Sequence, residues 1–250
     1  MRGEWFSRGI EEKGTDMNKN HYRMPAVLLL VCLLSSMCFC GCRKGSKFSV
    51  DDTLKHLKDR YGEEFTYVED YDAFQPAGGG YEFYVSCKSI PDQKIYVKVI
   101  RDGQGFRYVD NYLAAKYFAD TETAIRKLAE AVYGPDINLI FRLTKNMAVA
   151  DSDVDPDMML QDFWTNEKFD LSCCVKIKPD QGLEKKDAKL DILEKLIKAA
   201  KMYVRFSIYY MNSETAYIND STSPAAKDYD EHAILEIGEG FETKMKEWNR

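Results

Sequence analysis

Pairs of carboxylates are the most abundant groups in this sequence that could do chemistry. The 41 Asp and Glu residues include the adjacent pairs Glu63-Glu64 and Glu69-Asp70, and Glu236 near the end. Hydrolysis of a glycosidic bond needs two such carboxyl groups, one protonated and one ionised. With so many acids a pair can always be chosen, so the pattern has little specificity. A carboxylate-dependent cell-envelope hydrolase is therefore only an alternative, and solvated charge is the simpler interpretation.

A second acidic cluster has the spacing of a calcium-binding loop. Asp151, Asp153 and Asp155 stand at alternate positions, and Asp162 is twelfth when Asp151 is counted first. Carboxylates at these positions bind calcium in EF-hand loops. Such a loop needs glycine at its sixth position for a sharp turn, whereas Pro156, with its φ held negative, stands there. The first three aspartates are therefore secondary candidates for loose calcium binding.

The same segment can also be explained as the start of a helix. Asp155 has the side chain of an N-cap, Pro156 suits the first helical position, and Asp157 complements the helix dipole. We favour this capping hypothesis. No metal ion or other cofactor is expected to be required.

Nucleophilic catalysis has little support in the sequence. After residue 42 the chain contains two histidines, His56 and His232, and three cysteines, Cys87, Cys173 and Cys174. No G-x-S-x-G motif is present, and the cysteines match no zinc spacing. Adjacent cysteines point to opposite faces of a strand, so buried free thiols are favoured. A disulfide from Cys87 to one of the pair is the alternative.

The N-terminal region has the composition of a secretory signal. Lys19 and Arg23 precede an apolar run over residues 26–34, and a small-residue exit ends at Gly41, directly before Cys42. From the start of that run to Gly41 there are 16 residues, fewer than the roughly 20 that a transmembrane helix needs. An uncleaved membrane helix and complete release remain the alternatives to a lipid-anchored product.

Because Cys42 follows directly on the exit, this signal resembles that of bacterial lipoproteins of the Gram-positive type. In that family the cysteine is diacylated, the peptide is cut in front of it, and the mature protein stays on the outer face of the cytoplasmic membrane. Cys38 and Cys40 follow large residues, whereas Gly41 before Cys42 fits the small residue expected before the cut. Phe39 stands where the family usually has leucine.

The resemblance implies a division of the chain. Residues 17–41 would be the signal peptide, Cys42 the lipid anchor, 42–47 a tether, and 48–250 an extracellular domain that resembles no named family. Residues 1–16 do not fit, because the run Glu11-Glu12-Lys13-Gly14 needs purine-rich codons like those of a ribosome-binding site. We expect translation to begin at Met17 and residues 1–16 to be a mis-assigned start.

The charge balance indicates which partners to expect. Five of the 35 Lys and Arg and four of the 41 Asp and Glu lie in the first 41 residues, which leaves 30 basic and 37 acidic residues. This balance argues against nucleic acid as a partner, because such binding depends on a basic surface that neutralises phosphates. The expected partners are the membrane, through Cys42, and an envelope protein, peptide or glycan.

Sequence periodicity predicts the elements that must position these residues. Apolar residues at helical spacing predict helices over residues 50–61, 110–133 and 183–202. Short helices are also expected over residues 155–164, opened by Asp155-Pro156, and over residues 241–248. Alternation and apolar runs predict strands over residues 65–71, 81–87, 94–101, 106–109, 137–143, 170–178, 204–211 and 232–237. Ser49 and Gly62 would cap the first helix, and Asp102-Gly103 predicts a hairpin turn.

The order of these elements favours an α+β fold, a largely antiparallel sheet with helices packed on one face. A split into two subdomains near residues 134–136 is an additional hypothesis. Tyr203, Phe206, Tyr209 and Tyr210 could line a sugar or peptide groove, although strand packing explains them equally well. The function that these observations favour is a non-enzymatic, membrane-tethered binding or accessory domain.

Overall fold

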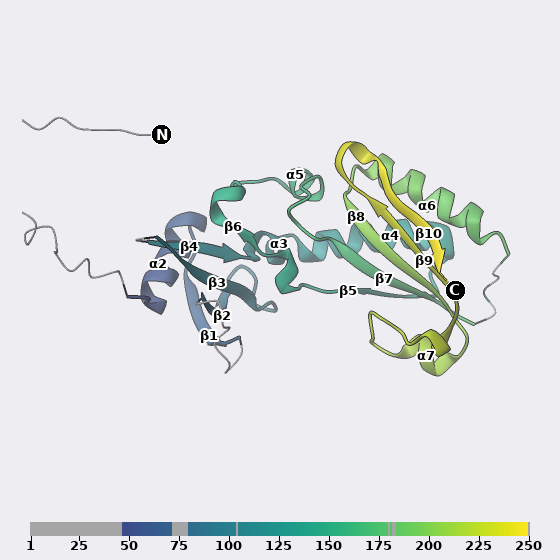
Figure 1. Ribbon diagram of the computed structural model, residues 1–250, viewed down its shortest axis with the longest axis horizontal. Helices are drawn as coiled ribbons and strands as arrows, with labels where there is room; N and C mark the ends of the chain where they lie inside the picture. Colours follow the sequence, from purple (N-terminus) through teal and green to yellow (C-terminus); the bar gives the residue numbers. More distant parts are fainter. Residues whose placement is uncertain (1–46, 72–79, 104, 180, 182–183, 250) are drawn as a thin grey trace, which may run out of the picture. The chain divides into compact units, whose positions relative to one another are not determined.

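The computed structural model describes residues 47–71, 80–103, 105–179, 181 and 184–249 of the 250-residue chain (Figure 1). The expected signal, the residues before Met17, Cys42 and nearly all of the tether lie outside the described residues. The described residues belong to one compact unit. Within the described ranges, no helix combines the length and the apolar character needed to cross a membrane.

The first sheet has five strands within the described ranges, in the order β1-β2-β3-β4-β6, and all neighbours are antiparallel. The strands are β1 (Phe65–Asp70), β2 (Gly80–Cys87), β3 (Ile95–Asp102), β4 (Gly105–Asp110) and β6 (Val149–Ala150). The turn from β3 to β4 contains Gly103 with a φ of 58°, which confirms the predicted hairpin.

Helix α2 (Val50–Tyr61) packs on one face of this sheet and begins and ends as the sequence predicts. The Ser49 hydroxyl accepts a hydrogen bond from the Asp52 amide at 3.3 Å. Gly62 adopts a φ of 71° and its amide donates to the Lys58 carbonyl at 2.8 Å. Leu57 is fully buried against the sheet.

The second sheet has five strands among the described residues, in the order β10-β9-β8-β7-β5. They are β5 (Ile137–Phe141), β7 (Ser172–Ile177), β8 (Val204–Met211), β9 (Tyr229–Ile237) and β10 (Thr243–Asn249). Only β7 and β8 run parallel, and helix α6 (Lys186–Ala200) connects them. The predicted α+β class is confirmed, with the strands divided over two sheets.

Two helices lie against one face of the second sheet (Figure 1). Helix α4 (Phe118–Tyr133) packs on α6 and on β5, and α6 packs on β9. Their apolar side chains join those of the inward-facing strand positions in a core that also includes residues of the first sheet. The division near residues 134–136 stays a prediction: the chain leaves the first sheet at Asp110 and enters the second at Ile137, but returns once at β6.

The opposite face of the second sheet is partly covered by the segment that contains helix α7 (Glu214–Ile218). Asn138 and Arg142 each donate to a carbonyl of residues 217–220 at 2.7 Å, and the Lys176 ammonium donates to a third. Burial lowers the pKa of Lys176, whose side chain is fully enclosed. The carbonyl therefore provides a partner that this buried cation requires.

The helix predicted over residues 110–133 is two helices. Helix α3 (Tyr112–Lys116) ends at Tyr117, where φ and ψ of −99° and 7° interrupt the α-helical backbone, and α4 begins at Phe118. The Tyr117 hydroxyl donates to the Met158 carbonyl, and its ring packs at 5.4 Å from that of Phe163. The break allows α3 to be buried beside the first sheet while α4 lies on the second.

The helix predicted over residues 241–248 was wrong, because most of this segment is strand β10. Its backbone pairs with β9 from Thr243 to Asn249, which satisfies main-chain groups that β9 would otherwise leave unpaired at the sheet edge. Trp248 packs against the core, and its indole donates to Asp187 at 2.8 Å. Pairing with a neighbouring strand outweighs local helical spacing here. A short 3₁₀ turn, Glu239–Phe241, precedes the strand.

Helix α5 (Leu160–Trp164) starts later than predicted. The Asp155 carboxylate accepts from the Asp157 amide at 2.9 Å, and the Asp155 carbonyl accepts from the Met158 amide at 3.2 Å. These bonds form a turn, so Asp155 does not cap a helix as the sequence suggested. The remaining short helical turns are Lys145–Met147, Asp151–Asp153 and Ala226–Asp228.

The buried carboxyl group of Asp110 lies at the end of β4, where the chain leaves the first sheet. Asp110 is only 3% exposed, accepts from the Tyr112 amide at 2.9 Å and from the Tyr61 hydroxyl at 3.0 Å. Burial raises the pKa of Asp110 to about 6, although the bonds from Tyr112 and Tyr61 and the charge of Arg60 oppose the rise. Asp110 therefore titrates within reach of neutral pH.

The next residue is also a buried polar group with both ends satisfied. Asn111 accepts from the Tyr96 amide at 2.7 Å and donates to the Thr144 carbonyl at 3.2 Å. One side chain thus joins β3 to the segment that returns toward β6. Together, Asp110 and Asn111 connect α2, β3, the start of α3 and the returning chain.

Replacing Asp110 by Asn should change how stability depends on pH. The native carboxyl holds its proton up to about pH 6 and the unfolded one releases it near pH 4, so stability falls as pH rises between these values. Over that window the wild type should lose up to about 3 kcal/mol relative to Asp110→Asn. Urea denaturation at pH 4, 5, 6 and 7 measures the difference. The exposed Asp162→Asn should run parallel to the wild type, and a parallel profile for Asp110→Asn would contradict the assignment.

Candidate functional site

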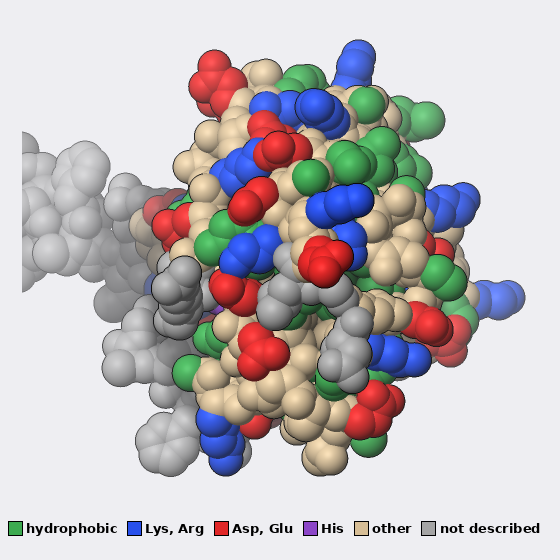
Figure 2. All heavy atoms as spheres, turned by 90° about the vertical axis from the view of Figure 1, so that its right-hand side faces the viewer, with side chains coloured by type: hydrophobic (Ala, Val, Ile, Leu, Met, Phe, Trp, Pro, Cys, Tyr) green, Lys and Arg blue, Asp and Glu red, His purple; other side chains and the backbone are tan. Residues whose placement is uncertain are grey.

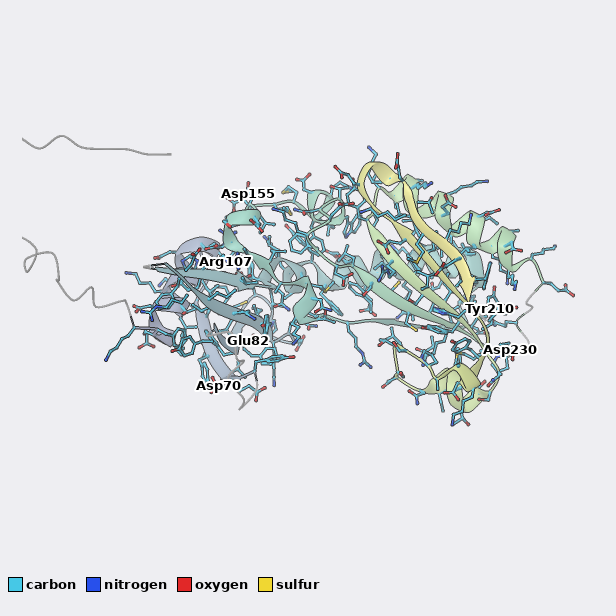
Figure 3. All side chains as sticks on the ribbon, viewed as in Figure 1. Asp70, Glu82, Arg107, Asp155, Tyr210 and Asp230 are labelled. Atoms are coloured by element: carbon cyan, nitrogen blue, oxygen red, sulfur yellow. The ribbon has the colours of Figure 1, made fainter. Side chains whose placement is uncertain are left out.

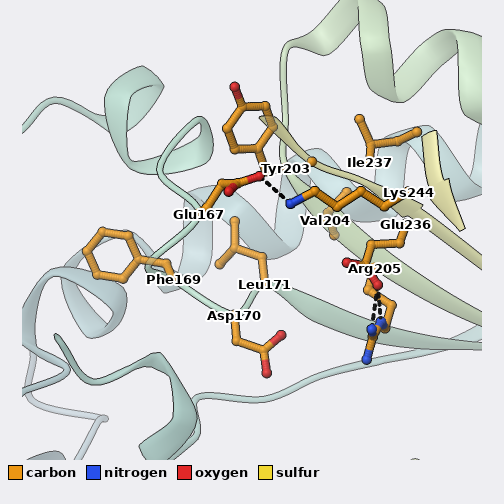
Figure 4. Close-up of a pocket in the computed structure, with 11 residues that line it drawn as sticks. Glu167, Phe169, Asp170, Leu171, Tyr203, Val204, Arg205, Glu236, Ile237 and Lys244 are labelled. Carbon is orange, nitrogen blue, oxygen red and sulfur yellow. Dashed lines mark hydrogen bonds and ion pairs between the residues drawn. The ribbon is translucent and has the colours of Figure 1, made fainter. Parts of the chain in front are cut away.

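A pocket of about 300 Å³ lies at one end of the second sheet (Figure 4). It forms where β7 and β8 begin, where β9 ends and where β10 begins. Its lining residues are Glu167, Phe169, Asp170, Leu171, Tyr203, Val204, Arg205, Glu236, Ile237, Gly238 and Lys244.

The parallel pairing of β7 and β8 creates this site. Because the two strands run in the same direction, their first residues meet at one sheet edge. The Arg205 amide donates to the Leu171 carbonyl at 2.9 Å, and the Tyr203 amide donates to the Trp164 carbonyl at 2.7 Å. The segments that lead into both strands are therefore held side by side, and the β9–β10 connection completes the pocket.

The floor of the pocket is apolar and well packed. Four of its side chains are 1–3% exposed: Phe169, Leu171, Val204 and Ile237. These residues belong to the main core, so they cannot move easily. The floor is therefore rigid, but so little of each side chain is exposed that it offers a ligand only a small apolar area.

The ion pair of Lys244 and Glu167 forms one side of the rim, and the Lys244 side chain lies over Gly238. Lys244 lies beside the Glu167 carboxylate, which also accepts from the Glu239 amide (Figure 4). Hydrogen bonding to Lys244 lowers the pKa of Glu167. A Cβ on Gly238 would lie 2.1 Å from Cε of Lys244, so a larger residue here would force the end of the lysine side chain to move.

The other side of the rim is a second ion pair. Arg205 and Glu236 face each other on adjacent strands β8 and β9. Nε of Arg205 lies 2.7 Å from Oε2 of Glu236, and Nη2 contacts the same oxygen. The pair compensates both charges, while the arginine side chain stays 45% exposed.

Asp170 is the remaining charged residue of the lining. It is exposed, and no hydrogen bond or ion pair joins its carboxylate to any residue that the structure describes. Figure 4 draws it at the pocket with no partner. The mouth therefore carries one uncompensated negative charge beside an apolar floor.

The arrangement does not suit carboxylate-based hydrolysis. A general acid needs a raised pKa, but the pKa of Glu167 is lowered by Lys244. Asp110, whose pKa is raised, is buried and does not line the pocket. Of the carboxylates that the sequence offered in pairs, Glu64 is ion-paired to Lys58 and Glu69 to Lys94.

The calcium candidates have separate partners. The carboxylate of Asp151 lies 3.0 Å from Nε2 of His56, that of Asp153 lies 3.8 Å from the Lys168 ammonium, and that of Asp155 forms the turn described above. Asp155 lies on the connection that precedes α5 (Figure 3). In the part of the chain that the structure describes, no three His, Cys, Asp or Glu side chains are arranged to hold a metal ion.

The three cysteines of the domain are free and buried. Cys173 and Cys174 belong to the cores on opposite faces of β7, as adjacent residues of a strand should. Burial raises the pKa of Cys174 to about 12 and that of Cys173 well above its ordinary value. Both are therefore protonated at neutral pH and weak nucleophiles.

The aromatic residues flagged in the sequence separate in space. Tyr203 lines the pocket and Tyr209 packs under the α7 segment, whereas Phe206 and Tyr210 belong to the main core. They do not line one groove. Apart from Glu236, which was named among the acids, the other pocket residues had no sequence signal, because they come from four segments that are separate in the sequence.

A second group of aromatic residues was missed by the sequence analysis. Tyr84 and Tyr96 are directly opposite on β2 and β3, with ring centres 6.3 Å apart, and Tyr71 packs on both. Lys145 lies 4.8 Å above the Tyr71 ring. The cross-strand pairing of Tyr84 and Tyr96 could have been inferred from the hairpin register.

Charges of both signs are interspersed on the surface. On the face shown in Figure 2, basic and acidic side chains lie among apolar ones without a block of one sign. Several of these side chains form ion pairs, such as Lys246 with Asp191 and Glu194. Charges paired in this way add little net attraction for a partner.

Comparisons with known proteins give a distant structural likeness. No protein-family model matches the chain, and no curated protein is significantly similar to it. A crystal structure of a DUF5037 family protein from Ruminococcus gnavus aligns with 79% of this chain and 92% of that chain, at 12% identity and a TM-score of 0.41. A likeness of this degree gives no information about function.

Replacing Gly238 by Ala should weaken the ion pair between Lys244 and Glu167. The added methyl group must displace the end of the Lys244 side chain, which separates it from Glu167. The pKa of Glu167 should then rise toward its ordinary value, as it should in Lys244→Met. NMR titration of the Glu167 carboxyl carbon measures this. Gly105→Ala, which has open space around the new Cβ, is the control. An unchanged Glu167 pKa in Gly238→Ala would refute the packing.

Proposed function

We propose that this chain is a membrane-tethered extracellular lipoprotein whose folded part is a non-enzymatic binding domain for a protein or peptide partner. The tether rests on the signal over residues 17–41 and on Cys42. The binding role rests on one observation, the pocket with a rigid apolar floor and a charged rim. A preformed pocket of this kind offers a partner a fixed shape and polar groups that set its orientation.

The lining of the pocket favours a polypeptide over a glycan. A pocket of about 300 Å³ lies at the lower end of the range for small-molecule sites, so it accommodates a group of the size of one side chain or one sugar ring. A sugar ring needs an exposed aromatic face on which to stack. Phe169 is buried in the floor, and the Tyr203 hydroxyl is engaged by the Gly240 amide. One projecting side chain of a partner polypeptide fits these constraints.

The same pocket makes the hydrolase the weaker alternative. Two of its three carboxylates, those of Glu167 and Glu236, are ion-paired, and Asp170 stands alone at the mouth. A glycosidase needs one carboxyl group held protonated beside an ionised one. Ion-paired rim residues serve to hold the shape of the pocket instead.

The short tether restricts where a partner can be. Six residues, 42–47, reach at most about 20 Å when fully extended. The folded part begins immediately afterwards, because Phe48 stacks on Tyr81 with ring centres 3.7 Å apart. A domain anchored at Cys42 would stay close to the bilayer, so its partner would be a membrane protein or a segment near the membrane surface.

Replacing Cys42 by Ser should remove the anchor. Two acyl chains give stable membrane attachment, so a protein that lacks them should be unlipidated and should leave the membrane fraction. Metabolic labelling with an alkyne fatty acid, followed by fractionation, measures both effects. Cys40→Ser should be labelled and membrane-bound like the wild type. Persistent labelling of Cys42→Ser would contradict the proposed anchor.

Blocking the pocket should abolish peptide binding. Random twelve-residue peptides displayed on phage would be selected on the full anchored chain in detergent micelles. Asp170→Trp places a large ring over the apolar floor and should weaken the selected peptides by more than about tenfold in calorimetry. The matched variant Asp162→Trp, on exposed α5, should bind as the wild type does. Equal binding by both variants would rule out the pocket as the binding site.

A further inference from the structure

The charges of the pocket are compensated unequally, and this inequality indicates which side chain it accepts. Glu167 pairs with Lys244 across Gly238, and Glu236 pairs with Arg205 across the β8–β9 ladder. Each pair cancels its own charge within the rim. Asp170 has no such partner among the residues that the structure describes.

We propose that the pocket binds a cationic side chain, lysine or arginine, of the partner polypeptide, with Asp170 receiving its charge. This inference rests on the proposed binding function and names the class of residue that the site recognises. The carboxylate at the mouth would accept one or two charge-assisted hydrogen bonds from the ammonium or guanidinium group.

The apolar floor matches the rest of such a side chain. Lysine and arginine carry a methylene stem that packs on apolar surface while the charged end remains near water. Leu171, Val204 and Ile237 lie at the bottom of the pocket and are only 1–3% exposed, so they offer the stem a small apolar contact. The stem would lie on this floor and the charged end would reach Asp170 at the exposed mouth.

Other side chains fit less well. An acidic side chain would be repelled by Asp170, and the Arg205 guanidinium that could attract it is already bonded to Glu236. A neutral apolar side chain would cover the floor but leave the carboxylate unpaired and partly dehydrated, which is unfavourable. The acidic excess of residues 42–250, 37 against 30, also attracts basic segments over a longer range.

The test uses two small probes that differ in one charged group. Nα-acetyl-lysine amide and its uncharged analogue Nα-acetyl-norleucine amide would be titrated into the isotope-labelled anchored chain in micelles. Backbone amide shifts of Leu171 and Val204 report occupation of the floor. The lysine probe should bind about two- to fivefold more tightly than the norleucine probe, which is the contribution of an exposed ion pair.

Asp170→Asn should remove this preference and leave norleucine binding unchanged, because it keeps the shape of the side chain and removes its charge. Asp162→Asn should behave as the wild type does. Added salt should weaken lysine binding to the wild type and have less effect on Asp170→Asn.

Two results would overturn the inference. If both probes bind equally and Asp170→Asn has no effect, the pocket has no preference for a cation. If Asp170→Trp nevertheless blocks the binding of both probes, the proposed binding function still stands. If the lysine probe causes no shift at Leu171 or Val204 at any concentration up to solubility, the pocket is not a site for a basic side chain. Peptides selected on the wild type that nevertheless lose binding in Asp170→Trp would again leave the proposed function standing.

Discussion

The structure depends on the satisfaction of two adjacent buried polar side chains, Asp110 and Asn111. A buried polar group without a hydrogen-bond partner lowers the free energy of unfolding, so the fold must bring partners to both residues. Tyr61 comes from α2, Tyr96 from β3 and Thr144 from the segment that leads to β6. These three bonds hold the first sheet, its helix and the returning chain in one arrangement.

The position of the pocket follows from the connections made beyond this point. Once α3 and α4 have been separated at Tyr117, α4 can cover the second sheet together with α6. Helix α6 is the crossover that makes β7 and β8 parallel, and parallel pairing is what brings the starts of both strands together. The loop before β7 and the turn after β9 then meet at that edge. Gly238 completes the site, because the end of the Lys244 side chain occupies the space that a Cβ at residue 238 would fill.

The distribution of charge gives the domain its chemical character. The acids that attract attention in the sequence are mostly ion-paired or hydrogen-bonded, and the carboxyl group with a strongly raised pKa, Asp110, supports the fold from inside. The thiols of Cys173 and Cys174 are weak nucleophiles, because they are buried and protonated. What remains at the surface is a pocket suited to recognition. This character supports the proposed binding role more than it supports the carboxylate-dependent hydrolase.

The sequence by itself was sufficient wherever the determining interactions are local. Helix α2 was predicted from Ser49 to Gly62 because a side chain bonds an amide three residues away and glycine tolerates a positive φ. The β3–β4 hairpin followed from Asp102-Gly103 for the same reason, and the signal that ends before Cys42 is likewise a linear pattern, whose anchor stays a prediction. Only the tertiary structure decided that residues 243–249 form a strand, because the β9 backbone supplies the hydrogen bonds. It also decided that Asp170 has no charged partner among the residues that the structure describes, because residues distant in sequence meet at the pocket only after β7 and β8 have paired.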